Sequence, residues 1–134
     1  MNDWPLAARL AVAAGALAAA LAVALGAASA HALKPLLLVN DPAGWFETAR
    51  RYHELHAIGL VAVGLAIALR PASRWITAAA VLLAAGIVLF SGSLYLRSLF
   101  GIQELRSLTP LGGVALMAGW VALALGVILP RRPR

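Results

Sequence analysis

The stretch LAVAAGALAAALAVALGAASA, Leu10–Ala30, runs for 21 residues without a charge or a proline. A hydrocarbon core about 30 Å thick is crossed by roughly 20 helical residues at 1.5 Å each, so this stretch is long enough to span a bilayer. Trp75–Leu96 and Leu111–Leu129 are stretches of the same kind, and Leu55–Leu69 reaches that length when the polar turns before it are included. The sequence therefore predicts a polytopic membrane protein.

The composition supports the same class of protein. Hydrophobic residues make up 63% of the 134-residue chain, whereas soluble domains are about 45–50% apolar. The net charge of +6 comes from Lys and Arg at the expected helix ends, where long basic side chains reach lipid phosphates. A nucleic-acid surface needs clustered basic residues on a soluble face, so we expect the bilayer and not nucleic acid as the partner. The absence of cysteine excludes disulfides and thiolate chemistry.

We expect a single all-α domain over residues 1–134, an integral membrane bundle of four transmembrane helices. The helices are predicted at about residues 6–31, 43–69, 73–98 and 109–129. Lys34-Pro35 and Arg70-Pro71 are predicted to end the first two, because proline cannot continue a helix. Asp41-Pro42 and Thr109-Pro110 have the pattern of a capping residue followed by proline at a helix start.

Small residues recur at helical spacing in the first helix, at Gly15, Ala19, Ala22 and Gly26. Such a stripe allows close approach of a neighbouring helix, either within the chain or in a homo-oligomer. Arg9, the apolar run and Ala28-Ser29-Ala30 also resemble a cleavable signal peptide. The run exceeds the usual 7–15 residues of a signal sequence, so we expect the helix to be retained.

Basic residues give a weak indication of orientation. If the N-terminus is inside, that side of the membrane holds Arg9, Arg70, Arg74, Arg131, Arg132 and Arg134, and the other holds Lys34, Arg50, Arg51, Arg97 and Arg106. Cytoplasmic loops carry the excess of Lys and Arg. The count therefore favours both termini inside (N-in/C-in) in a bacterial inner membrane.

Four alternating spans bring the polar ends of all four helices to one membrane face, opposite the termini. The candidate site residues on this polar face are His31, Glu47, Arg51, Tyr52, His53, Glu54, His56, Ser91, Ser93 and Tyr95. Spacings of three and four residues predict Glu47–Arg51 and Arg50–Glu54 ion pairs. These residues form either a self-neutralising patch or a proton or anion site.

Three histidines are the candidate metal ligands: His31, His53 and His56. Three imidazoles suit zinc or copper, and two suit haem. The alternative is that they cap helix ends or hydrogen-bond across the bundle, with Ser91, Ser93 and Tyr95 bridging helices in the same way. No cofactor is required by any motif, although a metal or haem is left open.

Four ordered motifs resemble a known family. They are GAASAHAL (residues 26–33), FETARRY (46–52) followed by His56-Ala57, FSGSLY (90–95), and TPLGG (109–113) followed by Gly119-Trp120. The chain resembles the YgdD-like family of small bacterial membrane proteins, a domain of unknown function (number 423). Ala28-Ser29 replaces the Phe-Gly pair usual before the first histidine. The resemblance implies four membrane helices, an uncleaved first helix and no established activity. Its motifs coincide with the polar face.

The sequence leads to three hypotheses of function. The first is a non-enzymatic scaffold or accessory subunit of a larger membrane complex, since the chain is small and carries no catalytic constellation. The alternative is a binding or transport module whose polar face holds a metal, haem, proton or small anion near His31 and His56. A membrane enzyme ranks last, because neither a Ser-His-acid arrangement nor a metalloprotease motif is present.

Overall fold

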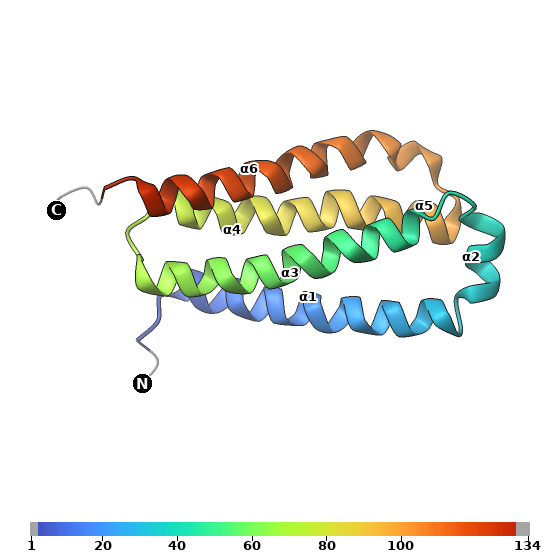
Figure 1. The fold of residues 1–134 in the computed structure, drawn as a ribbon, viewed down its shortest axis with the longest axis horizontal. Helices are drawn as coiled ribbons and strands as arrows, with labels where there is room; N and C mark the ends of the chain where they lie inside the picture. Colours follow the sequence, from blue (N-terminus) through green and yellow to red (C-terminus); the bar gives the residue numbers. More distant parts are fainter. Residues whose placement is uncertain (1–2, 131–134) are drawn as a thin grey trace.

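The computed structural model describes residues 3–130, which contain helices and no strand. Four long helical segments lie side by side, and α1 begins at the same end of the molecule where α6 ends (Figure 1). They are α1 (Leu6–Ala30), α3 (Trp45–Leu69), the continuous segment Arg74–Phe100, and Gln103–Ile128. All four are long and apolar enough to cross a membrane. The predicted all-α membrane bundle is confirmed.

The third span contains three elements in one rod. α4 (Arg74–Gly86) passes into a π-helical segment, η1 (Ile87–Gly92), and then into α5 (Ser93–Phe100). The Ser73 hydroxyl caps α4 by accepting from the Ile76 N–H at 3.4 Å. The fourth span begins with a 3-10 turn, η2 (Gln103–Ser107), before α6 (Leu108–Ile128).

The first loop differs from the prediction. The sequence predicts that Lys34-Pro35 stops a helix, but these residues begin a short helix, α2 (Lys34–Asn40), with proline in its first turn. Proline suits that position because the first N–H groups of a helix have no intrahelical acceptor. α2 crosses the end of the bundle (Figure 1), and its Asn40 Nδ2 donates to the Leu99 carbonyl of α5 at 3.0 Å. α3 consequently begins at Trp45.

Small residues allow the helices to approach closely. Gly15 of α1 lies so near α3 that an added Cβ would be 2.8 Å from the Ala57 carbonyl oxygen. In return, Gly64 of α3 lies against Val12 and Ala8 of α1. The predicted stripe is therefore an interface within the chain. At its far end Gly26 faces the Arg50 side chain, which would lie 3.4 Å from an added Cβ.

The end of the bundle opposite α2 is apolar inside. Its fully buried side chains come from three helices: Val63 and Ile67 of α3, Ile76 and Leu83 of α4, with Leu116 of α6 nearly so. Burying such side chains excludes water from this half of the interior. Polar side chains therefore gather in the other half, where α2 and both loops of the polar face lie.

Candidate functional site

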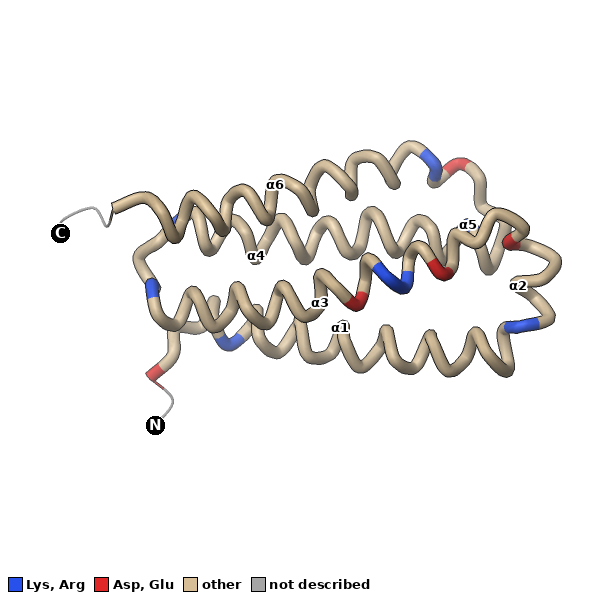
Figure 2. The backbone as a smooth tube through the Cα atoms, viewed as in Figure 1, with Lys and Arg blue, Asp and Glu red and all other residues tan. Residues whose placement is uncertain are grey.

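Charged residues of the polar face lie along the first turns of α3 (Figure 2). Arg50 lies at the centre: its Nη2 pairs with Glu47 at 2.8 Å, its Nε donates to the same carboxylate at 2.9 Å, and its Nη1 pairs with Glu54. Arg51 Nε pairs with Glu47 at 3.1 Å. Both predicted ion pairs are formed, and the Arg50–Glu47 pair is an addition.

This quartet of two arginines and two glutamates has no net charge. Because all its ion pairs lie within one helix, α3 neutralises it without a partner from another element. Arg50 faces Gly26 of α1, so the quartet lies beside the α1–α3 interface. A self-neutralised cluster of this kind lets a helix end lie at membrane depth at low electrostatic cost.

Deeper in α3, two histidines are buried and hydrogen-bonded. The Nδ1 atom of His53 lies 3.2 Å from the Tyr95 hydroxyl of α5. The Nδ1 atom of His56 lies 2.7 Å from the carbonyl oxygen of Tyr52. A carbonyl oxygen only accepts, so the His56 Nδ1 carries a proton.

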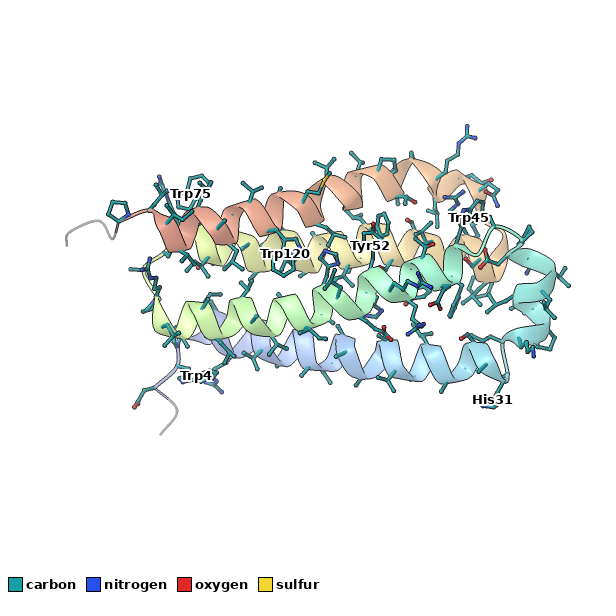
Figure 3. The ribbon with its side chains drawn as sticks, viewed as in Figure 1. Trp4, His31, Trp45, Tyr52, Trp75 and Trp120 are labelled. Atoms are coloured by element: carbon teal, nitrogen blue, oxygen red, sulfur yellow. The ribbon has the colours of Figure 1, made fainter. Side chains whose placement is uncertain are left out.

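Two aromatic rings contact the imidazole of His56. Tyr52 stacks on its imidazole with ring centroids 5.9 Å apart, and the Trp120 ring of α6 lies 6.0 Å from the same imidazole. Tyr52 also contacts Phe90 of η1 at 4.6 Å. Figure 3 shows Tyr52 and Trp120 in the middle of the bundle. The imidazole thus has one aromatic neighbour on α3 and another on α6.

The structure does not bring the three candidate histidines together. His31 is the exposed C-terminal cap of α1 and lies at the outer end of the bundle, far from Tyr52 (Figure 3). His53 and His56 follow Trp45 by eight and eleven residues, which places them about 12 and 16 Å into the bundle at 1.5 Å per residue. Among residues 3–130, no three His, Asp or Glu side chains form a group that could hold a metal.

The three remaining candidates lie on the third span. Ser93 Oγ bonds both to the Phe90 carbonyl at 2.9 Å and to the Thr109 hydroxyl of α6 at 2.8 Å, so it bridges two helices. Tyr95 packs edge-on against Phe46 of α3. Ser91, in the π-helical segment, is buried, and its hydroxyl has no hydrogen-bond partner among the described residues.

Sequence reasoning missed the aromatic partners Phe46, Phe90 and Trp120, and the Arg97 guanidinium stacked 3.9 Å from the Trp45 ring centroid. Each of these contacts joins residues of two different helices. The sequence does not specify which residues of two packed helices lie at the same height. The four-residue spacing of Tyr52 and His56 is the one signal within a single helix that indicates a stacked pair.

These features define a small multi-pass membrane protein with a self-neutralised charge cluster at the start of α3. The chain belongs to the family described as "Protein of unknown function (DUF423)", which matches residues 25–113. That range contains every candidate residue of the polar face. The resemblance drawn from the sequence motifs is confirmed.

Several relatives are similar over most of their length. The chain is 40% identical to the UPF0382 inner membrane protein YgdD of Escherichia coli (strain K12) over 90 residues, 66% of this chain and 67% of the relative. It is 40% identical to the UPF0382 membrane protein YwdK of Bacillus subtilis (strain 168) over 83 residues, 62% and 68% of the two chains. A UPF0382 membrane protein of Staphylococcus haemolyticus is 35% identical over 116 residues, 86% and 92% of the two chains. No solved structure matches the chain.

The relatives are called membrane or inner membrane proteins, and four helices of this chain have the length and apolarity to span a bilayer. The protein is therefore a multi-pass protein of the bacterial inner (plasma) membrane, and its exposed apolar side chains contact lipid.

Proposed function

We propose that the protein is a non-enzymatic membrane scaffold or accessory subunit whose polar residues stabilise its own bundle. The observation that carries this proposal is the pairing within the polar face. Arg50 and Arg51 are neutralised by glutamates of the same helix. His53 and His56 are bonded to Tyr95 and to a backbone carbonyl. The His53–Tyr95 contact joins α3 to α5, and the other bonds engage polar groups within α3, so these groups have partners in the protein itself.

The shape of the interior supports the same proposal. The largest fully buried side chains fill the space between the helices. A shallow groove of about 350 Å³ lies outside the helix bundle, between the end of α1 and α2, and is lined by Ser29, Lys34, Leu37, Leu38, Asp41 and Pro42. It contains neither of the buried histidines, so the groove and the paired groups are separate.

A scaffold needs a partner, and we propose a second copy of the chain or a larger membrane complex. α1 packs mainly on α3, and its outer side chains Leu17 and Val23 are 72% and 69% exposed. Extraction of native membranes into polymer-bounded discs tests this proposal by the mass of the released particle. We expect a mass well above one 13.9 kDa chain plus lipid; discs holding a single chain and no other protein would contradict it.

The structural role of the polar face is tested with His56→Ala. His56 is 4% exposed, stacks on Tyr52 and donates to a carbonyl. Its removal should lower the free energy of unfolding on the order of 2–3 kcal/mol, because a cavity forms and the contacts with the Tyr52 and Trp120 rings are lost. His31→Ala is the matched control: His31 is exposed, and we expect its loss to leave the melting temperature in detergent unchanged.

Metal analysis and a visible spectrum of the purified protein complete this test. We expect a colourless, metal-free sample from both variants and from the parent. A stoichiometric metal or haem band that His56→Ala removes without unfolding the protein would contradict the scaffold proposal and favour a binding module.

One observation favours that second candidate. The Ser91 hydroxyl is buried without a partner among the described residues, and an unsatisfied buried hydroxyl costs about 1–3 kcal/mol. The direction in which Ser91→Ala changes the melting temperature shows whether the Ser91 hydroxyl binds a ligand. If nothing occupies the site, the variant melts higher than the parent; if a small polar molecule bonds to the hydroxyl, it melts lower. Ser98→Ala is the control, because the Ser98 hydroxyl donates to the Leu94 carbonyl at 2.8 Å.

A further inference from the structure

Among residues 3–130, Arg97 shares with Arg9, Arg74 and Arg106 the lack of a carboxylate partner, and it differs from them in being stacked on an aromatic ring. Arg50 and Arg51 are paired with glutamates, and Arg70 donates to the carbonyls of Gly126 and Val127 at the end of α6. Arg97 has no carboxylate within ion-pair distance among residues 3–130; its Nη2 donates only to the side-chain oxygen of Gln103, at 3.4 Å.

The guanidinium of Arg97 is nevertheless held in place. It lies 3.9 Å from the centroid of the Trp45 ring, a distance at which the ring attracts a cation. Its Nε is buried and has no acceptor among the described residues. The group is therefore oriented and partly desolvated on one side, with a positive charge that no acidic side chain of residues 3–130 balances.

The C-terminus of α5 offsets only part of this charge. Arg97 lies in the last turn of α5, where the helix dipole is equivalent to about half a negative charge. Glu104, the neighbour of Gln103, is exposed and forms no ion pair with Arg97. Part of the charge of Arg97 is therefore left without a counter-charge among residues 3–130.

Position within the membrane identifies the kind of anion. Trp45 is the first residue of α3, and Arg97 lies three residues before the end of the third span, so both lie at a membrane–water interface. Tryptophan is enriched at that level, which is where lipid phosphates lie.

We propose that Trp45 and Arg97 form a binding site for the headgroup phosphodiester of an anionic phospholipid. The free edge of the guanidinium donates to the phosphate oxygens, a geometry that suits its planar fork. A headgroup without an amine is preferred, because the ammonium of a zwitterionic lipid would be repelled by the Arg97 guanidinium. This site is independent of the scaffold proposal.

Native mass spectrometry of the full chain in detergent tests the site. The protein is titrated with phosphatidylglycerol, with phosphatidylcholine and, separately, with inorganic phosphate. Arg97→Gln is compared with Arg106→Gln, a matched control on the same membrane face whose arginine is exposed. Arg97→Lys keeps the charge and removes the fork. Thermal unfolding of each variant establishes that it is folded.

We expect phosphatidylglycerol to bind more tightly than phosphatidylcholine. Arg97→Gln should weaken phosphatidylglycerol binding about tenfold, the change that corresponds to one lost charge-assisted hydrogen bond. Arg106→Gln should bind as the parent does, and Arg97→Lys should lie between the two. If Arg97→Gln does not fold, intermediate binding by Arg97→Lys carries the test.

Three results would overturn the proposal. They are unchanged phosphatidylglycerol binding by the Arg97 variants, an equal loss in Arg97→Gln and Arg106→Gln, and full displacement of the lipid by millimolar inorganic phosphate. The second result would indicate general surface charge, and the third a site for free phosphate.

Discussion

At the scale of single residues, the neighbouring arginines Arg50 and Arg51 have different roles. Arg50 joins Glu47 and Glu54, and its side chain is 25% exposed, whereas that of Arg51 is 75% exposed and bonds only to Glu47. The spacing in the sequence predicts Arg51 as the partner of Glu47. In the structure Arg50 also pairs with Glu47, so loss of Arg51 does not leave that carboxylate without a partner.

Arg50→Ala should therefore destabilise the protein more than Arg51→Ala does. Its loss removes charge-assisted hydrogen bonds to two glutamates, worth on the order of 2 kcal/mol. Loss of the exposed Arg51 should cost about 0–1 kcal/mol. Thermal unfolding of both variants in the same detergent measures the difference. Equal melting temperatures would contradict the central position of Arg50.

Gly112 of α6 marks the closest approach of two helices. A Cβ at this position would overlap the Phe90 backbone nitrogen and lie 2.7 Å from the Leu89 carbonyl carbon. Backbone atoms cannot move aside as a flexible side chain does. Gly112→Ala should therefore lower the free energy of unfolding by about 1–3 kcal/mol.

The neighbouring glycine is the matched control for this prediction. A Cβ at Gly113 would meet only the Phe90 ring, at an ordinary 3.6 Å. Gly113→Ala should leave stability unchanged or raise it by up to about 1 kcal/mol, because alanine favours the helix. Chemical unfolding of the two variants side by side is the measurement, and a higher stability of Gly112→Ala would refute the close packing.

At the scale of elements, the start of α3 depends on Asp41. Its carboxylate accepts from the N–H groups of Trp45 and Phe46, both at 2.8 Å, although it lies four residues before the helix. Asp41→Ala leaves these first-turn donors without acceptors and should cost about 0.5–2 kcal/mol. Glu104→Ala, at an exposed acid without an ion pair among the described residues, should cost nothing. Melting temperatures that fall equally in both variants would rule out this capping role.

The spans and the intrahelical ion pairs could be predicted because each depends on residues close together in the sequence. The π-helical segment around Ser91 could not, since it depends on how α6 packs against η1. The Lys34-Pro35 pair is typical of a helix stop, although the same ring geometry also suits a helix start. α1 ends at Ala30, so its cap His31 lies exposed at the outer end of the bundle, apart from the two buried histidines of α3.

At the scale of the whole molecule, the unequal distribution of charge predicts orientation. α1 begins and α6 ends at one end of the bundle (Figure 1). In the sequence six basic residues belong to that end and five to the opposite end. Two of those five, Arg50 and Arg51, form ion pairs within α3. The other three form no ion pair with an acidic side chain of residues 3–130. Because unpaired Lys and Arg are retained in the cytoplasm, we expect both termini inside.

Paired reporters measure this orientation. Green fluorescent protein fused after Arg134 should fluoresce, and alkaline phosphatase fused at the same point should be inactive, because each works on only one side of the membrane. Alkaline phosphatase fused after Gly101, in the loop before η2, should be active in the periplasm. The reverse pattern would place the polar face in the cytoplasm, and the Trp45–Arg97 pair would then lie at the inner leaflet. The charge count and the location of that pair are thus tested together by one set of fusions.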